Sequence, residues 1–165
     1  MNRELSKEDF VARFGGIYEH SPWVAEAAAE QLAGGSDIEH IAAAMAASVD
    51  NASRSRQLEL IRAHPDLAGR AQIAGELTAD STSEQASAGL DCCTKEEYAR
   101  FQVLNAAYHD KFGFPFVMAV RDRSRHEILA AFEARLGHDP NTEFRTAIAE
   151  IHKIALLRLR ALEAE

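Results

Sequence analysis

The sequence has only two cysteines and no long apolar run. Cys92 and Cys93 are adjacent, and adjacent residues do not easily meet the geometry of a disulfide with each other, so a reducing compartment is the simpler interpretation of both thiols. The longest apolar runs, such as residues 41–47 and 114–120, are far shorter than the roughly 20 residues that a membrane span needs. The sequence therefore predicts a protein that does not cross a membrane.

The motifs of metal and nucleotide chemistry are also missing. The chain contains no His-Glu-x-x-His, no paired Cys-x-x-Cys, no Gly-x-Ser-x-Gly and no phosphate-binding Gly-Lys-Ser/Thr, and its seven His residues are not spaced as ligand pairs. A net charge of −8, from 18 Lys and Arg against 26 Asp and Glu, leaves no basic stripe to bind a phosphate backbone. We therefore expect no metal site and no nucleic-acid partner.

Length and the chain ends add two expectations. With 165 residues, 47% of them apolar, the chain has the size and composition of one globular domain spanning residues 1–165. Residues 1–9 are charged and lack the apolar stretch of a secretory signal, and the last residues carry no peroxisomal address. These features indicate a cytoplasmic location.

The dominant period of the sequence is helical. Alanine is abundant, glycine and proline are sparse and lie between periodic segments, and no stretch of four or more residues alternates cleanly enough to require a strand. The pattern predicts an all-α bundle of about eight to nine helices, with residues 114–120 as the one extended apolar segment. We expect helices over residues 6–15, 22–34, 36–49, 53–63, 65–74, 84–90, 94–112, 123–136 and 141–162.

His64 lies at the junction of two predicted helices, because Pro65 ends the first helix and occupies the first turn of the next. The positive N-terminal end of a helix favours a neutral imidazole, which is the form that a general base needs. The alternative is that His64 only caps the helix.

The segment from Ser81 to Gln85 also has two interpretations. Its Ser-x-x-Glu spacing is that of a capping box, in which Glu84 binds a backbone amide at the start of its own helix. Alternatively, Glu84 points into a cleft as a proton donor or acceptor, and Gln85 offers its amide to a urea-like ligand.

Arg158 is an anomaly on the last predicted helix. It shares a face with apolar residues at i−7, i−4 and i+4, so a guanidinium faces the core. A buried guanidinium needs an anion, which is either a ligand carboxylate or a structural partner such as Glu84 or Asp66.

Asn105 is a second polar residue in an apolar environment. It follows the same 3-4-3-4 spacing as four aromatic residues of its helix, Tyr98, Phe101, Tyr108 and Phe112. Because a buried amide needs hydrogen-bond partners, we expect Asn105 to bind backbone near residues 114–120, and the alternative is that it holds a loop that contacts a ligand.

Four separated motifs and the last helix together resemble one family, the 2-oxo-4-hydroxy-4-carboxy-5-ureidoimidazoline (OHCU) decarboxylases. The resemblance covers roughly residues 10–160: FGGIYEHSPW at 14–23, HPDLA at 64–68, STSEQASAGLD at 81–91, LNAAYHDKFGFPF at 104–116 and EIHKIALLRL at 150–159. It implies an all-α fold, usually a homodimer, that releases CO2 from OHCU and forms (S)-allantoin in the last step of urate degradation. It implies neither a metal nor an organic cofactor.

The resemblance also implies roles for individual residues. The family's catalytic histidine falls on His64 and its acidic partner on Glu84. Contacts to the ligand fall on Pro65, Ser81, Gln85, Phe116, Val117 and Arg158, with Val117 standing where the family often has Ile. The missing peroxisomal signal, which eukaryotic relatives often carry, implies a bacterial enzyme.

Two other functions stay open from the sequence. One is a hydrolase that opens a hydantoin-like ring, in which His64 activates water. The other is a noncatalytic helical binding domain, in which His64, Glu84 and Arg158 form a buried polar network that only fixes the fold.

Overall fold

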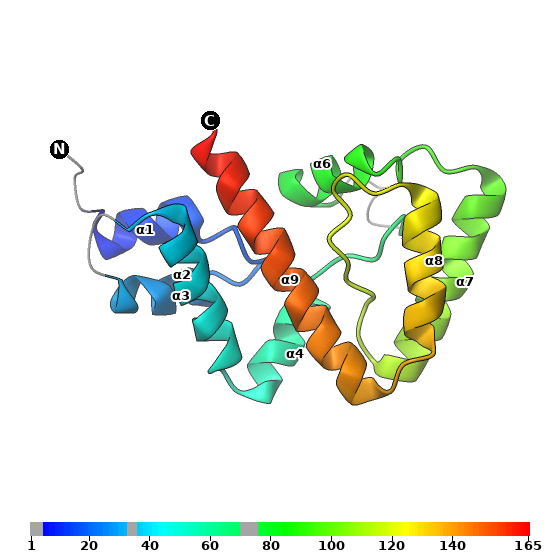
Figure 1. Cartoon of the computed structure of the whole chain (residues 1–165), viewed down its shortest axis with the longest axis horizontal. Coiled ribbons are helices and arrows are strands. Elements are labelled where there is room, and N and C mark those ends of the chain that lie inside the picture. The colour runs from blue at the N-terminus through cyan, green and yellow to red at the C-terminus, as the bar shows by residue number, and fades with distance from the viewer. Residues whose placement is uncertain (1–4, 33–35, 70–75) are drawn as a thin grey trace. The chain divides into compact units, whose positions relative to one another are not determined.

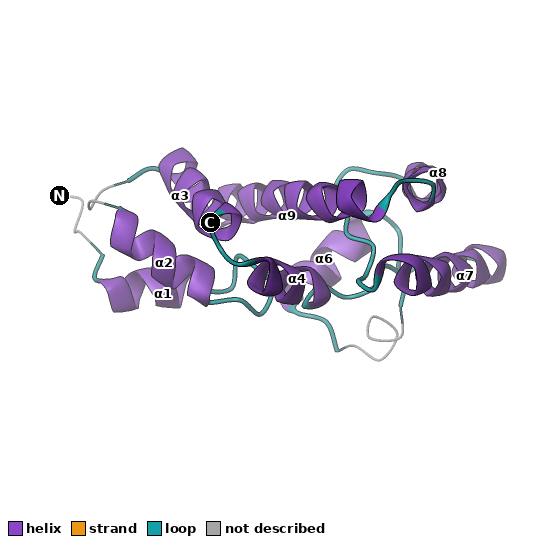
Figure 2. Ribbon diagram, turned by 90° about the horizontal axis from the view of Figure 1, so that it is seen from below, coloured by secondary structure: helices purple, strands orange, loops and turns teal. Residues whose placement is uncertain are grey.

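The computed structural model describes residues 5–32, 36–69 and 76–165, and these residues form eight α-helices and no strand (Figures 1 and 2). The all-α prediction is confirmed. The helices are α1 (Lys7–Phe14), α2 (Trp23–Gln31), α3 (Ile38–Asp50), α4 (Arg54–Arg62), α6 (Ala79–Ser87), α7 (Lys95–Phe112), α8 (Arg125–Leu136) and α9 (Pro140–Glu163).

Most of these helices begin and end where local signals place them. Thr94 and Ser124 open α7 and α8 with complete capping boxes, because Glu97 and Glu127 bind the backbone of the capping residue in return. Gly113 closes α7 in the left-handed conformation, at φ 75°. Six predicted helices, those that correspond to α1, α3, α4, α7, α8 and α9, are therefore confirmed to within about two residues at each end, which is the usual scatter of helix boundaries.

The chain divides into two compact units. The first, here the terminal unit, comprises Met1–Ala63 and His152–Glu165, and the second, here the central unit, comprises His64–Ile151. The residues of α9 are shared between the two units, and the prediction of one domain over residues 1–165 stays a prediction. Among the described residues, no helix is long and apolar enough to cross a membrane.

The core of the terminal unit is built from α1, α2, α3, α4 and the C-terminal part of α9. Its most buried side chains are Phe14, Val24, Met45, Val49, Leu60, Ile61 and Leu159. A hydrogen-bonded chain joins distant parts of this unit: His152 binds the Tyr18 hydroxyl through Nδ1, at 2.8 Å, and Asp50 through Nε2, at 3.0 Å. Tyr18, which lies in the loop between α1 and α2, is thereby tied to α9.

The core of the central unit is aromatic. Tyr108 of α7 lies at its centre and meets Phe114, Phe116 and Phe132 edge to face, at centroid distances of 5.5 to 5.9 Å. Phe116 also stacks on Phe132, 3.9 Å apart. These contacts bury the apolar segment 114–120 without any strand pairing, so the expectation of one extended apolar segment is confirmed.

Three helix predictions are wrong in their bounds. Residues 65–69 contain a turn at Leu67 and Ala68 and no helix, and the rest of that prediction, residues 70–74, lies outside the described residues. The helix predicted over residues 22–34 ends at Gln31, because Leu32 is extended, and Gly34 and Gly35 lie outside the described residues. The helix predicted over residues 84–90 begins at Ala79 and ends at Ser87. Its true N-cap is Thr78, whose hydroxyl accepts from the Ser81 amide.

Candidate active site

His64 follows the C-terminal end of α4 and is buried, with 8% of its surface exposed. The end of α4 at Arg62 confirms that Pro65 stops this helix. The helix predicted to start at Pro65 is absent over residues 65–69, so the described residues provide no helix N-terminus to favour a neutral imidazole. What remains of the argument for His64 as a base is its burial next to an ordered turn.

That turn, Asp66–Ala68, is held by side chains rather than by a helix. Gln85 of α6 accepts from the Ala68 amide at 3.0 Å and donates to the Asp66 carbonyl at 3.2 Å. From α7, Gln102 donates to the Ala68 carbonyl at 2.9 Å and Asn105 donates to the Leu67 carbonyl at 3.0 Å. The prediction that Asn105 binds backbone near residues 114–120 is therefore wrong, because its amide binds the turn after His64.

The buried face of α6 is polar. Ser81, Glu84 and Gln85 are spaced i, i+3 and i+4, and all three are buried. Ser81 is the third residue of the helix and Glu84 lies in its interior, so the capping-box interpretation of this pair is wrong. The second interpretation of Glu84, a proton donor or acceptor, stays a prediction.

Arg135 of α8 contacts both the Val117 carbonyl and the Phe116 ring. The Nη1 atom of Arg135 donates to the Val117 carbonyl at 2.7 Å, and its guanidinium lies 4.3 Å from the centre of the Phe116 ring. The Arg135 Nε atom donates to Glu143 Oε2 at 2.9 Å, and Nη2 makes an ionic contact of the same length without hydrogen-bond geometry. Sequence reasoning missed this pair, although Arg135 lies on the apolar face of α8 with Ile128 and Phe132.

Glu143 is the most buried carboxylate of this network, with no exposed surface. Tyr108 donates its hydroxyl to Glu143 Oε2, and His138 Nδ1 lies 2.8 Å from Oε1. Burial alone would raise the pKa of Glu143, but hydrogen bonds from Arg135 and Tyr108 and the charge of Arg135 outweigh it, so the pKa lies below its ordinary value. Burial, with the hydrogen bond to Glu143, raises the pKa of Tyr108, so this hydroxyl stays a donor.

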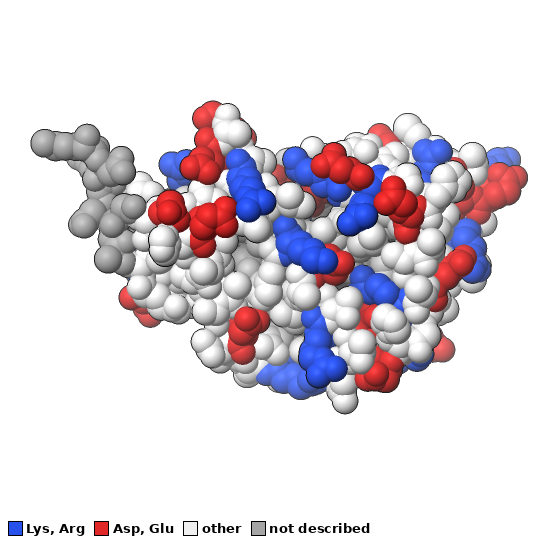
Figure 3. All heavy atoms as spheres, viewed as in Figure 1, with Lys and Arg blue, Asp and Glu red and all other residues white. Residues whose placement is uncertain are grey.

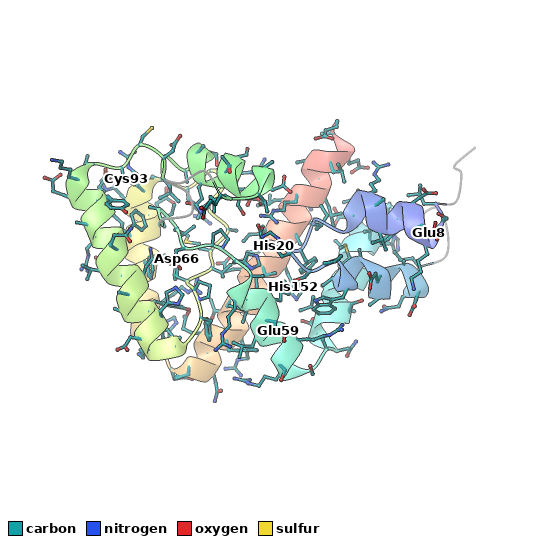
Figure 4. All side chains as sticks on the ribbon, turned by 180° about the vertical axis from the view of Figure 1, so that it is seen from behind. Glu8, His20, Glu59, Asp66, Cys93 and His152 are labelled. Carbon is teal, nitrogen blue, oxygen red and sulfur yellow. The ribbon has the colours of Figure 1, made fainter. Side chains whose placement is uncertain are left out.

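Arg158 is buried in the terminal unit, as its spacing predicts. Its Nη2 atom lies 2.8 Å from Glu19 Oε2, and Nη1 donates to the Ile17 carbonyl at 3.1 Å. The sequence suggested Glu84 or Asp66 as the structural partner of Arg158, and the structure places Glu19 there instead. Glu19 is followed by His20, labelled in Figure 4, which is held at φ 47°, a strained conformation for a residue with a side chain.

Two further features of the central unit, a hollow and a pair of thiols, contain none of the predicted catalytic residues. A hollow of about 480 Å³ is lined by Ala68, Leu90, Asp91, Cys93, Thr94, Lys95 and Tyr98. A hydrogen bond with Asp91 raises the pKa of the exposed Cys92 thiol, and burial raises the pKa of Cys93, so both stay protonated near neutral pH. In the part of the chain that the structure describes, no three His, Cys, Asp or Glu side chains gather as a metal site.

The surface carries charges of both signs, as expected from a sequence with 18 Lys and Arg and 26 Asp and Glu. On the face shown in Figure 3, acidic and basic side chains are interspersed. The exposed ion pairs, such as Lys7–Glu30 and Arg100–Glu133, are of the kind that contributes little to stability.

The scaffold is all-α, and each unit buries ionisable side chains, His64 and Glu84 in the central unit and Arg158 in the terminal unit, which is typical of a helical enzyme domain. The sequence profile of one family, OHCU decarboxylase, matches residues 3–160. The chain belongs to this family.

Individual relatives agree with this assignment. The 2-oxo-4-hydroxy-4-carboxy-5-ureidoimidazoline decarboxylase of Haloferax volcanii is 50% identical over 155 residues, which are 94% of this chain and 89% of that protein. A crystal structure of (S)-allantoin synthase is 40% identical, with a TM-score of 0.77 over 96% of this chain, and this chain spans about half, 51%, of that one. A second crystal structure, an OHCU decarboxylase in the presence of (S)-allantoin, shares the fold, with a TM-score of 0.72 and 22% identity over 98% of this chain and all of that one.

Proposed function

We propose that this member of the OHCU decarboxylase family catalyses the decarboxylation of OHCU to (S)-allantoin, the last step of urate degradation. The family match over residues 3–160 carries the proposal. It is supported by the burial of seven of the eight proposed site residues, since Pro65 alone among them is half-buried. A set of polar groups kept out of water is what acid–base chemistry on a small polar substrate requires.

The substrate's own structure supplies the electron sink. OHCU carries a hydroxyl and a carboxylate on one carbon, next to a C=N bond. When CO2 leaves, the electron pair of the broken C–C bond forms a C=C bond to the neighbouring carbon, and the C=N pair moves onto nitrogen, which takes a proton. No pyridoxal or thiamine is therefore needed as an electron sink. The enzyme then has to bind, orient and move protons, and we propose that it uses neither a metal nor an organic cofactor.

The proposed roles follow from the chemistry of each side chain. His64 takes or polarises the proton of the substrate hydroxyl, and Arg158 orients an anionic or carbonyl group. Glu84 and Gln85 hold the ureido and ring amides. The remaining ligand contacts come from Pro65, Ser81 and the backbone of Phe116 and Val117. Delivery of one proton to one face, from Glu84 or from protonated His64, gives the product its (S) configuration.

The proposal includes a homodimer in a bacterial cytoplasm. The adjacent positions of Cys92 and Cys93, which do not favour a disulfide between them, support a reducing compartment. Light scattering during size-exclusion chromatography measures the assembly directly, and a monomer at micromolar concentration would contradict the dimer.

The proposed function is tested by making OHCU in place from urate with the two enzymes that precede this step. Circular dichroism then follows the appearance of (S)-allantoin, with a metal chelator present. Uncatalysed decay gives a racemate and no lasting signal, so we expect a rapid (S) signal only when this protein is added. Ring opening without CO2 release would identify a hydrolase instead, and no acceleration would leave a binding domain.

A substitution at Glu84 tests its role in proton transfer. We expect Glu84→Gln to lower kcat by about a hundred-fold or more, because general acid–base groups contribute roughly that much and glutamine cannot carry the proton. The melting temperature should stay close to that of the parent, since volume and hydrogen bonding are kept. Asp80→Asn makes the same charge change on the exposed face of α6 and should keep full activity. Equal activity in the two variants would remove Glu84 from the mechanism.

A further inference from the structure

We propose that Gln102 and Asn105 are positioning residues for His64. With Gln85 they form an amide clamp on the Asp66–Ala68 turn, and the clamp fixes the direction of the imidazole. This inference rests on the proposed function, because it assigns no chemistry of its own to the two amides. It adds two residues of α7 to the proposed site, which otherwise has no residue on this helix.

The clamp binds all three carbonyls of the turn and one of its amides. Three amide side chains satisfy the carbonyls of Asp66, Leu67 and Ala68 and the amide of Ala68, with donor–acceptor distances of 2.9 to 3.2 Å. In a helix these groups would bind other backbone groups four residues away. Here the sequence of the turn leaves them to side chains, so the position of the turn depends on α6 and α7.

The turn does not hold this shape through its own preferences. Ala68 has a φ of 50°, in the left-handed region that alanine adopts only under constraint. At Gly69 a side chain would not fit, because a Cβ atom there would lie 2.8 Å from Asp66 Cβ. A strained, tight turn that three side chains hold in place is of the kind found at functional sites.

His64 is coupled to the turn through a single residue. Pro65 lies between His64 and Asp66, and its ring locks φ near −65°, so little of a displacement can be absorbed there. On the far side, Asp66 Oδ1 lies 2.7 Å from His109 Nε2 of α7, which adds a fifth contact between the turn and its surroundings. A shift of the turn therefore moves the imidazole.

Asn105 belongs to the clamp through its donor. The side chain is buried, with 5% of its surface exposed, on the same face of α7 as Phe101 and Tyr108, and its Nδ2 atom donates to the Leu67 carbonyl. Because a buried amide needs hydrogen-bond partners, this donor ties α7 to the turn.

The test compares two half-buried glutamines that make the same kind of contact. Gln102→Met removes the donor to Ala68, and Gln57→Met removes the donor that Gln57 directs to the Val49 carbonyl at 2.9 Å, in the terminal unit. We expect similar falls in melting temperature for both variants. Only Gln102→Met should lower kcat, by about ten- to a hundred-fold, with KM within two-fold of the parent, because a displacement of about 1 Å has effects of that size.

Binding is measured separately through the rise in melting temperature that (S)-allantoin produces, which Gln102→Met should keep. Should this variant fail to fold, Gln102→Asn is the second choice, because it keeps the amide but shortens its reach by one methylene. We then expect a smaller fall in kcat, again with KM nearly unchanged. An unchanged kcat in a folded Gln102 variant, or an equal loss of kcat in Gln57→Met, would show that Gln102 does not position His64. Inactivity of the parent protein would instead overturn the proposed function.

Discussion

Replacing His64 with asparagine or alanine is expected to lower kcat by about a hundred- to ten-thousand-fold, the usual contribution of a general base. The imidazole is buried, and neither replacement can accept a proton near neutral pH. His64→Asn should keep a melting temperature close to that of the parent, because Gln85, Gln102 and Asn105 still hold the turn that follows. The stereospecific circular-dichroism assay measures kcat, and thermal unfolding checks the fold.

A matched control is available on α8. His126 is exposed and belongs to the same unit, so His126→Asn should keep the parent kcat. Near-normal turnover in His64→Asn would show that another group takes the substrate proton, and Glu84 would then be the first to test. A loss of both activity and melting temperature would favour the third possibility from the sequence, a polar network that only fixes the fold.

Local signals predicted most of the helices because capping and breaking act over a few residues. Thr94 with Glu97, Ser124 with Glu127, and Gly113 each determine a helix end through contacts within one turn of helix. The periodicity of α9 likewise placed Arg158 on a buried face, and the structure confirms it. These features could be predicted because their physical causes lie close together in the chain.

Two of the helix errors have different causes. Pro65 has the right chemistry to begin a helix, but the distant side chains of Gln85, Gln102 and Asn105 bind the backbone groups that a helix would use. No spacing rule for one segment can identify such partners. The second error is local: the N-cap of α6 is Thr78, three residues before Ser81, so Glu84 lies in the helix interior and not in a capping position.

The carboxylate partners of the buried arginines show the same limit. Arg158 pairs with Glu19, which lies in a loop at the other end of the sequence, and Arg135 pairs with Glu143 on the next helix. The sequence does show that a guanidinium on an apolar face needs an anion. Which anion it finds is decided by tertiary packing, and Arg135 could have been recognised by the same spacing argument as Arg158.

Removing the Glu143 carboxylate is expected to have the largest effect on stability. Glu143→Ala leaves Arg135 buried without its counter-charge, and breaking a buried pair in this way costs about 3–5 kcal/mol. It also frees the Tyr108 hydroxyl and loosens the guanidinium that holds the Val117 carbonyl. Urea unfolding at pH 7 measures the loss, and Glu133→Ala, which breaks the exposed pair with Arg100, should change stability by no more than about 1 kcal/mol.

The pH dependence of unfolding separates charge from packing at the same position. Because the pKa of Glu143 lies below its ordinary 4.5 in the folded protein, the folded state binds fewer protons there than the unfolded state. Its contribution is therefore complete above about pH 4.5 and is lost as the pH falls through the lower, folded pKa. Glu143→Gln keeps the shape but cannot titrate, so its stability should fall less steeply below pH 4.5 than that of the parent. Parallel curves for the two proteins would mean that Glu143 stabilises the central unit through packing and neutral hydrogen bonds, with no contribution from its charge.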